Sequence, residues 1–328
     1  MLRVLKIVLV NVVLTATLLV AIEGVSRLLV PTPMPQPLVA DELEQWVGKR
    51  EFHPLLFWRM TPSVDAEGSV VINRLGLRGP LPGPRQPDEL RVLSLGESTT
   101  AALALPLDQA YSAVLERELA AREGRPVRVI NAGTGGYSLA QGVTFARLHG
   151  FDLEPDLVLT YFGYNDFTRA SFRSRRDANA SGTSLGLTDL EVIRQRSRPL
   201  SRVQSWLQQR SNLVRWAAER KTPPEIRRAG RRRVPAEDRL VLYRELALMC
   251  RDRGARLVVL VPIYRDSARH EGFLRELGES HGFEVIDLPR LLDGELGERA
   301  PFFFDALHPR ADLHQRIGVT IAAQLEDA

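Results

Sequence analysis

The chain has 328 residues, of which 44% are hydrophobic and 7% aromatic, a composition that excludes wholesale disorder and suits one sizeable α/β domain with additions. The 44 basic and 40 acidic residues nearly balance, but the stretch 173–233 holds 15 Arg and one Lys against five acids. The single cysteine, Cys250, excludes an intramolecular disulfide and a multi-cysteine metal site. We expect Cys250 to be a buried helical residue.

The N-terminal segment is strongly apolar. Nineteen residues from Val4 to Ile22 contain one charged side chain, Lys6, and about 20 apolar residues span a bilayer as a helix. Basic residues precede the segment and Glu23 follows it, so the positive-inside rule places the remainder of the chain outside the cytoplasm. A cleaved signal peptide is the alternative. Because no small-x-small cleavage site and no lipobox cysteine follow, we favour an uncleaved membrane anchor at residues 1–30.

A proline-rich linker and an irregular lead-in are predicted over residues 31–89. Alternate prolines from 31 to 37 make a stiff, extended spacer. The remainder shows no clear periodicity, although the run Ile72–Pro80 combines Asn, Gly and Arg in a turn-like pattern. We therefore place the start of the folded domain at residue 90 and its end at residue 328.

From residue 90 onward, short apolar runs alternate with helical patterns. The predicted strands are Arg91–Leu95, Val127–Asn131, Leu157–Tyr161, Arg256–Val261 and Phe283–Asp287. The predicted helices are Tyr111–Glu123, Ser138–Leu148, Ala236–Arg253, Ser267–His281 and Pro309–Leu325. This alternation predicts a parallel sheet covered by helices on both faces. Because ligands bind beyond the carboxyl ends of such strands, catalytic groups should lie directly after a strand or on a loop that reaches the same edge.

Three loops after predicted strands carry suitable groups. Ser98 follows the first strand in a Gly-Glu-Ser turn, where backbone N–H groups favour an oxyanion, although the pattern also fits a turn with a helix cap. Three glycines in the loop 131–138 permit close backbone approach or a flexible connection. Asn165 follows the third strand and can donate a side-chain N–H to a developing negative charge, or form an Asx turn.

A fourth loop lies near the C-terminus. Asp305 and His308 are three residues apart, ahead of a helix whose first turn Pro309 can begin. A serine hydroxyl needs a positioned base to become a nucleophile near neutral pH, and histidine is the side chain best matched to that work. The Asp-x-x-His spacing lets the carboxylate orient the imidazole ring.

These loops together resemble the sequence blocks of the SGNH/GDSL hydrolase superfamily over residues 90–328. The matching blocks are Gly96-Glu97-Ser98, Gly133 within Asn131–Gly136, Gly163-Tyr164-Asn165-Asp166 and Asp305-Ala306-Leu307-His308-Pro309. The resemblance implies a three-layer α/β/α sandwich of flavodoxin-like type with a five-stranded parallel sheet, which agrees with the five predicted strands. The run INRLGLRG also resembles a segment of bacterial membrane-anchored members.

The resemblance implies a role for each motif residue. Ser98 would be the nucleophile, His308 the general base and Asp305 the residue that orients His308. The oxyanion hole would combine the backbone N–H groups of Ser98 and Gly133 with the side chain of Asn165. No metal or organic cofactor is implied.

Two further residues of the motifs, Glu97 and Asp166, are expected to support the site. Members of the superfamily usually have Asp between the motif Gly and Ser, where this chain has Glu97. Glu keeps the charge but is one methylene longer, so the geometry of the loop can differ while the chemistry is retained.

The resemblance favours a serine esterase or deacylase that removes O-acyl or O-acetyl groups from a carbohydrate or lipid. One alternative is an O-acyltransferase for envelope or exopolysaccharide sugars, since only the acceptor of the acyl group differs. The other is a non-catalytic glycan-binding or assembly protein on the same fold, against which the intact set of motif residues argues. The domain is expected to be periplasmic or extracellular and to have no nucleic-acid partner.

The basic stretch interrupts the alternation of strands and helices as an insertion at residues 171–235. Its apolar residues can form amphipathic helices over the site as a lid, namely Trp206, Leu207, Leu213, Val214 and Trp216. Its arginines can meet an anionic polysaccharide, lipid headgroups or solvent. The remaining histidines have no metal-ligand spacing and are expected at the surface or in helices, namely His149, His270, His281 and His314.

Overall fold

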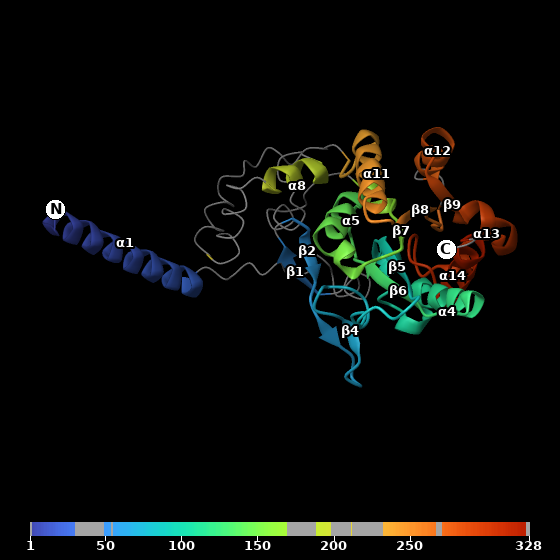
Figure 1. Cartoon of the computed structure of the whole chain (residues 1–328), viewed down its shortest axis with the longest axis horizontal. Coiled ribbons are helices and arrows are strands. Elements are labelled where there is room, and N and C mark those ends of the chain that lie inside the picture. The colour runs from blue at the N-terminus through green and yellow to red at the C-terminus, as the bar shows by residue number, and fades with distance from the viewer. Residues whose placement is uncertain are drawn as a thin grey trace.

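The computed structural model describes residues 2–29, 49–53, 55–168, 188–197, 211, 232–266 and 271–325. The predicted proline spacer, the apolar residues assigned to a lid and His270 lie outside the described residues. The described part forms a five-stranded parallel sheet between two layers of helices, with the helix α1 (Leu2–Leu29) at the N-terminus (Figure 1).

The central sheet has the strand order β6-β5-β7-β8-β9, and all its neighbouring strands are parallel. The strands are β5 (Leu90–Gly96), β6 (Val127–Gly133), β7 (Leu157–Tyr161), β8 (Arg256–Val261) and β9 (Glu284–Asp287). Every residue of β5 and β7 is buried, because helices cover both faces of the sheet. The chain reverses its direction of progress across the sheet between β5 and β7. This reversal is the topological switch point at which parallel sheets bind their ligands.

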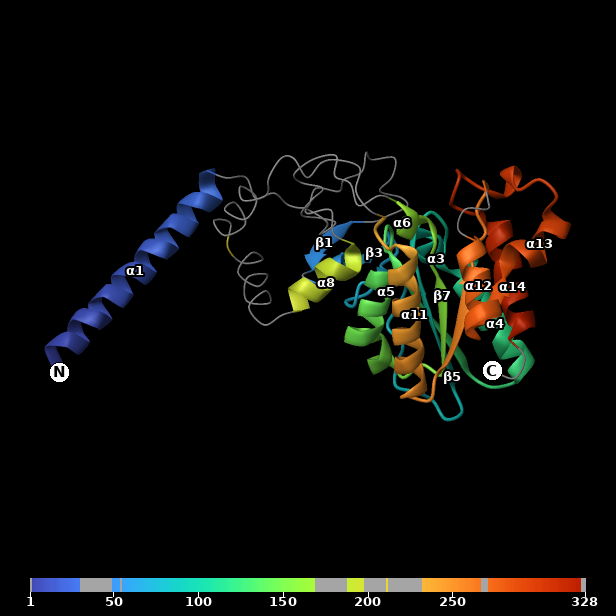
Figure 2. The same cartoon turned by 90° about the horizontal axis from the view of Figure 1, so that it is seen from above.

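Two layers of helices cover the sheet. One apolar core joins the sheet to α5 (Leu139–Phe145), α8 (Asp189–Ser197), α11 (Ala236–Arg251) and α12 (Glu271–His281). A second core joins its other face to α4 (Tyr111–Glu123), α13 (Leu288–Leu296) and α14 (Ala311–Gln324). Figure 2 shows α5 and α11 on one side of the strands and α4 and α14 on the other. The predicted α/β/α sandwich is therefore confirmed.

The predicted elements of the sandwich agree closely with the observed ones. The strands differ from the predictions by at most two residues at an end, and α4 begins and ends where the helical pattern predicted. Helix α5 is shorter than predicted because a π-helical turn continues it over Ala146–Gly150. Helix α13 was not predicted, since it follows β9 directly and has only nine residues, although its buried residues Leu288, Leu292 and Leu296 recur at a helical spacing. Cys250 is buried in α11, as expected.

The lead-in is more regular than predicted. It contains two antiparallel pairs of short strands, β1 (Arg50–His53) with β2 (Phe57–Met60) and β3 (Ser63–Val64) with β4 (Val70–Ile72). Strands of two to four residues show too little alternation to be recognised in a sequence. The expectation of an irregular segment was therefore wrong for these residues.

The run Ile72–Pro80 fastens the lead-in to the sheet. The Asn73 side chain accepts hydrogen bonds from the backbone of Leu75 and Leu77, which closes the turn that the sequence indicated. The backbone N–H of Arg78 then donates to the carbonyl of Asn131 on β6 at 3.1 Å. The lead-in therefore packs directly against the sheet.

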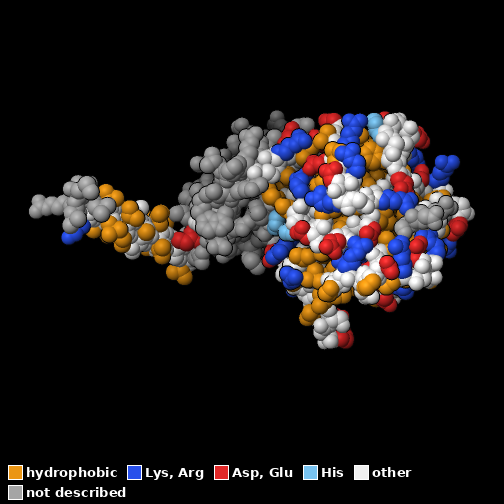
Figure 3. Space-filling view, in the orientation of Figure 1, with side chains coloured by type: hydrophobic (Ala, Val, Ile, Leu, Met, Phe, Trp, Pro, Cys, Tyr) orange, Lys and Arg blue, Asp and Glu red, His pale blue; other side chains and the backbone are white. Residues whose placement is uncertain are grey.

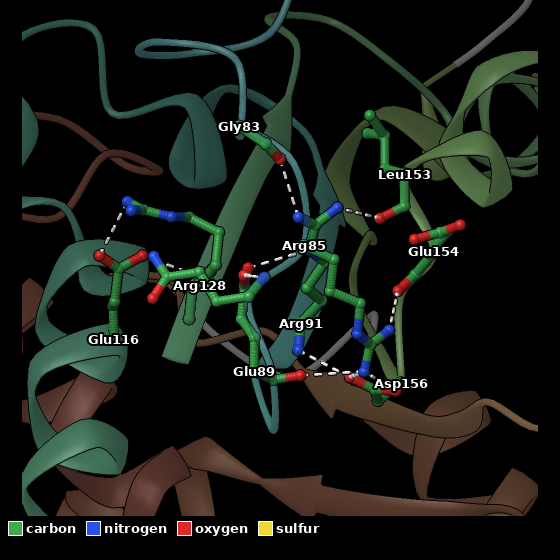
Figure 4. Close-up of polar contacts among 11 residues, drawn as sticks. Gly83, Arg85, Glu89, Arg91, Glu116, Arg128, Leu153, Glu154 and Asp156 are labelled. Carbon is green, nitrogen blue, oxygen red and sulfur yellow. Dashed lines mark hydrogen bonds and ion pairs between the residues drawn. The ribbon is translucent and has the colours of Figure 1, made fainter. Parts of the chain in front are cut away.

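A network of arginines and carboxylates closes the amino ends of β5 and β7 (Figure 4). Arg91 and Glu89 form a buried ion pair at 2.9 Å, and Arg91 also donates to the carbonyl of Gly83. Arg85 donates to both oxygens of Asp156, each at 2.7 Å. The network holds the last residues of the lead-in against the edge of the sheet that lies opposite the carboxyl ends of the strands.

Helix α1 carries apolar side chains along most of its length (Figure 3). Its segment Val8–Ser26 has 19 residues with a mean hydropathy of 2.2, and its large apolar side chains are exposed, whereas Ser26 at its end is buried. This length and composition fit a membrane anchor, and they fit a signal sequence equally well.

Candidate active site

The carboxyl ends of three neighbouring strands bring the predicted loops together. Gly96 at the end of β5 pairs with Gly133 of β6 on one side and with Tyr161 of β7 on the other. Ser98 begins the one-turn helix α3 (Ser98–Ala101) directly after β5. Asn165 lies in the one-turn helix α6 (Tyr164–Phe167), which follows β7. Both side chains therefore lie at the switch point of the sheet.

Ser98, His308 and Asp305 form one hydrogen-bonded row. The Nε2 atom of His308 lies 2.8 Å from the Ser98 hydroxyl oxygen, although 210 residues separate the two in sequence. The Nδ1 atom lies 2.7 Å from Oδ2 of Asp305. Since an ionised carboxylate only accepts hydrogen bonds, Nδ1 carries the proton of the neutral ring and Nε2 accepts from Ser98.

The loop that carries His308 is fixed on both sides of the imidazole. The N–H of Phe304 donates to the carbonyl of His308 at 2.9 Å, which closes the loop on itself. The Thr99 hydroxyl donates to the carbonyl of Leu307 at 3.3 Å and connects the loop to the turn after β5. The site therefore depends on a direct contact between the two loops in addition to the row of side chains.

Burial and hydrogen bonding set the charges of the row. Burial lowers the pKa of the His308 imidazole below its ordinary value of 6.5, although Asp305 opposes the shift. Burial of Asp305 favours its neutral form, but hydrogen bonds from the His308 ring and two backbone N–H groups outweigh it and lower the pKa of this carboxyl. Near neutral pH the ring is therefore a free base beside a carboxylate.

Asn165 is held by the carboxylate of Glu97. Its Nδ2 donates to Oε2 of Glu97 at 2.6 Å, and its backbone N–H donates to the same oxygen at 3.3 Å. Glu97 is 2% exposed, and burial raises the pKa of its carboxyl to about 7. The second N–H of the Asn165 amide has no acceptor among the described residues and remains for a ligand.

Gly133 occupies a different place from the one expected of an oxyanion donor. Its N–H donates to Oδ1 of Asn131 at 3.0 Å and is therefore already engaged. A Cβ atom on Gly133 would lie 2.2 Å from the backbone nitrogen of Ala101, so glycine is required for packing beneath α3. This geometry counts against the expected role of Gly133 as an oxyanion donor.

Asp166, the second expected supporting residue, joins two loops. Its side chain is buried and accepts a hydrogen bond from the backbone N–H of Leu139 at 2.8 Å, at the start of α5. Burial raises the pKa of this carboxyl to about 7. Asp166 therefore connects the loop that carries Asn165 to the helix that follows the glycine loop.

Tyr264 is a residue of the site that the sequence analysis missed. It lies three residues after β8, and its hydroxyl donates to Oε1 of Glu97 at 2.5 Å. It is 3% exposed. The rule that groups after strands belong to the site applies to it, but a tyrosine in a Pro-Ile-Tyr run carries no motif of its own.

Two of the other described histidines, His53 and His149, lie with their ring centroids 6.5 Å apart. His314 is buried in α14, where its Nδ1 accepts from the backbone N–H of Tyr111 at 3.1 Å, so it is a helix residue as expected but is not at the surface. His281 is exposed at the end of α12. Among the described residues no group of three or more His, Cys, Asp or Glu side chains is arranged to hold a metal ion.

A parallel α/β/α sandwich with a hydrogen-bonded row of Ser, His and Asp at its switch point is the arrangement that serine hydrolases use. The family model of the GDSL-like lipase/acylhydrolase family matches residues 94–316, which is more than half of the chain. The chain belongs to this family and is an ester-cleaving serine hydrolase. No curated protein matches the sequence.

Several solved structures are similar to the chain, each with a TM-score of 0.45. LAE5, an alpha/beta hydrolase enzyme from the metagenome of Lake Arreo, is 19% identical, and the match covers 71% of this chain and 94% of that one. A lipase/acylhydrolase from Enterococcus faecalis is 18% identical, with 72% and 95% covered. Axe2, an acetylxylan esterase from Geobacillus stearothermophilus, is 15% identical, with 73% and 95% covered. Similarity at this level says nothing about the substrate of this chain.

Proposed function

We propose that the chain is an esterase or deacylase in which Ser98 is the nucleophile, His308 the general base and Asp305 the residue that orients His308. The observation that carries the proposal is the row of contacts from Asp305 through His308 to Ser98, at 2.7 and 2.8 Å. The lowered pKa of His308 supports it, because a base must be unprotonated at the working pH.

The proposed reaction has two halves. Nε2 of His308 takes the Ser98 proton while Oγ attacks the ester carbonyl, and the tetrahedral intermediate collapses as His308 returns this proton to the departing alcohol. Water then attacks the acyl-enzyme with His308 as base, releasing the acid and restoring the hydroxyl. Asp305 stabilises the imidazolium that forms in each half.

The oxyanion hole that we propose contains the backbone N–H of Ser98 and the side chain of Asn165. Both groups lie at the ends of β5 and β7, which are hydrogen-bonded neighbours. Gly133 was expected as a third donor, but its N–H is engaged by Asn131. Preorganised donors of this kind contribute about 3–4 kcal/mol each to stabilisation of the transition state.

For the substrate we propose O-acyl or O-acetyl groups on a carbohydrate or lipid. We also propose that residues 1–30 anchor the chain in a membrane and that the hydrolase domain, residues 90–328 with a basic insertion at 171–235, lies outside the cytoplasm. Helix α1 is long and apolar enough for an anchor. An anchored domain would have membrane lipids and acylated envelope glycans within reach, which supports this substrate class.

The test uses the full-length chain and a small p-nitrophenyl ester. The wild type should hydrolyse the ester and react with a fluorophosphonate probe, and Ser98→Ala should lose both properties while it remains folded. Retained labelling and turnover in the variant would refute the assignment. Product analysis with and without an acceptor glycan separates hydrolysis from acyl transfer, and a wild type that never reacts with the probe indicates a binding protein.

A further inference from the structure

The carboxylate of Glu97 connects three strand ends. It lies in the turn after β5, its Oε2 accepts from Asn165 after β7, and its Oε1 accepts from Tyr264 after β8. Both donor–acceptor distances are short, at 2.6 and 2.5 Å. The Glu97 carboxylate therefore lies between Asn165, the candidate oxyanion donor, and Tyr264. Tyr264 lies in neither the loop that carries Ser98 nor the loop that carries His308.

The direction of the hydrogen bonds around Tyr264 is determined by its neighbours. The Tyr264 hydroxyl accepts from the backbone N–H of Tyr164 at 3.0 Å. Its own proton is then directed to Oε1 of Glu97. The Glu97 carboxylate accepts hydrogen bonds from the Tyr264 hydroxyl and from the Asn165 N–H groups. Because all of these partners are donors, they favour the ionised form of the carboxyl.

An ionised Glu97 selects the orientation of the Asn165 amide. The two ends of an amide are nearly equal in shape but opposite in hydrogen bonding, since Nδ2 donates and Oδ1 accepts. Only Nδ2 can face an acceptor 2.6 Å away, and its second N–H then remains for an oxyanion. A protonated Glu97 can instead donate to Oδ1, which would place an oxygen lone pair where the oxyanion forms.

We propose that Tyr264 and Glu97 are positioning residues for the oxyanion hole: the Tyr264 hydroxyl keeps Glu97 an acceptor, and Glu97 holds the Asn165 amide with its nitrogen toward the oxyanion. This inference rests on the proposed function, in which Asn165 is a donor. The extra methylene of Glu97, compared with the Asp usual in the superfamily, lets one carboxylate reach both partners.

Four titratable groups face Glu97 from the elements packed around it. They are Tyr264 after β8, Tyr161 on β7, Asp166 on α6 and Tyr243 on α11. The pKa of each tyrosine is raised by burial, so the three stay neutral. Burial raises the pKa of Glu97 to about 7, and the hydrogen bond from Tyr264 opposes this rise. Loss of the Tyr264 hydroxyl should therefore raise the pKa of Glu97 further.

The experiment compares the pH dependence of kcat in full-length wild type, Tyr264→Phe, Glu97→Gln and Glu97→Asp. In Tyr264→Phe we expect kcat at pH 7 to fall about 10-fold with KM changed less than twofold, and to recover by about pH 9 as Glu97 ionises. In Glu97→Gln the acid limb that belongs to Glu97 should disappear, leaving only the limb of His308 at lower pH, and kcat should stay low at every pH. The side chain in Glu97→Asp is too short to contact both Asn165 and Tyr264. We therefore expect the kcat of this variant at pH 7 to fall about as much as that of Tyr264→Phe.

The matched control is Tyr161→Phe. It removes another buried tyrosine hydroxyl, one that hydrogen-bonds the backbone of Ile263 and does not contact Glu97. We expect it to lower thermal stability and leave the position of the acid limb unchanged. Thermal melts of every variant separate loss of folding from loss of positioning.

Three outcomes overturn the inference. One is a folded Tyr264→Phe with the wild-type pH profile. Another is an acid limb that keeps its wild-type midpoint in Glu97→Gln, which would assign that limb to Asp166 or His308. The third is a fall of kcat in Tyr161→Phe as large as in Tyr264→Phe, with the same shift of the acid limb. A Ser98→Ala arm tests the proposed function separately, because full turnover in that variant refutes the nucleophile whatever the other variants show.

Discussion

Ser98 and His308 lie 2.8 Å apart, although 210 positions separate them in sequence. In the proposed mechanism, removing either group leaves the oxyanion hole without an activated nucleophile. We expect Ser98→Ala and His308→Ala each to lower kcat/KM for a p-nitrophenyl ester by at least about 1000-fold, and the double variant to lose little more, because the pair works as a unit. Steady-state kinetics on the three variants would measure this, and additive losses would contradict a shared step.

The pH dependence of kcat/KM should show the state of His308 in the free enzyme. Burial lowers the pKa of this imidazole, so its basic form is present above a midpoint below 6.5 and is lost as the pH falls through that midpoint. Asp305→Asn should weaken kcat/KM at every pH, because the amide can no longer anchor the Nδ1 proton as a carboxylate does. In Glu97→Gln, where residue 97 no longer titrates, a kcat/KM profile with its acid midpoint above 6.5 would contradict the assignment.

Gly133 is required for a steric reason. A Cβ atom there would lie 2.2 Å from the backbone of Ala101 and 2.7 Å from Cβ of Thr100, and the backbone of α3 cannot move without displacing Ser98. We expect Gly133→Ala to lower the free energy of unfolding by about 3 kcal/mol and to reduce activity, as measured by urea denaturation and ester hydrolysis. Gly294→Ala in α13, where a Cβ meets nothing within 4 Å, is the control and should be neutral or stabilising. Equal effects of the two would refute the packing argument.

At the scale of elements, the ion pair between Arg91 and Glu89 connects the lead-in to the first strand of the sheet (Figure 4). Both side chains are 6% exposed, so Arg91→Leu removes the ion-pair partner of a buried carboxylate that keeps, among the described residues, only the hydrogen bond from the backbone N–H of Gln86. We expect Arg91→Leu to lower the free energy of unfolding by about 3–5 kcal/mol, measured by urea denaturation.

The control for this prediction is an ion pair on the surface. Arg251 and Asp252 are 74% and 64% exposed, so Arg251→Ala should change stability by less than about 1 kcal/mol. A loss in Arg91→Leu that is no larger than in this control would show that the buried pair does not hold the sheet edge.

The strands and helices of the sandwich could be predicted because their apolar residues repeat with a clear period. Strand β7 is buried along its whole length and is apolar except for Thr160, so its limits follow from the residues alone. The short strands β1 to β4 could not be predicted, because pairs of two to four residues form through contacts with other parts of the chain. Arg78, for example, is placed by Asn131 of β6, which is remote in sequence.

At the scale of the whole molecule, α1 stands apart from the enzyme's two apolar cores. If it anchors the chain, deletion of residues 1–30 should move the protein from the membrane fraction to the soluble fraction and leave kcat for a soluble ester within about twofold. Fractionation of cells that express both forms would measure this. An N-terminal epitope that is lost from a soluble full-length product would show a cleaved signal sequence instead.

The sequence by itself determined the class of fold, the loops after β5, β6 and β7, and the identities of Ser98, His308 and Asn165 as candidates, because residue type and spacing record local chemistry. Only the tertiary structure decided that the Gly133 N–H is engaged, that His314 is buried, and that Tyr264 reaches Glu97. The last two facts depend on contacts between segments remote in sequence, and the first on the conformation of the turn that joins Asn131 to Gly133. No periodicity or local motif encodes such distances, since they arise when the strands align.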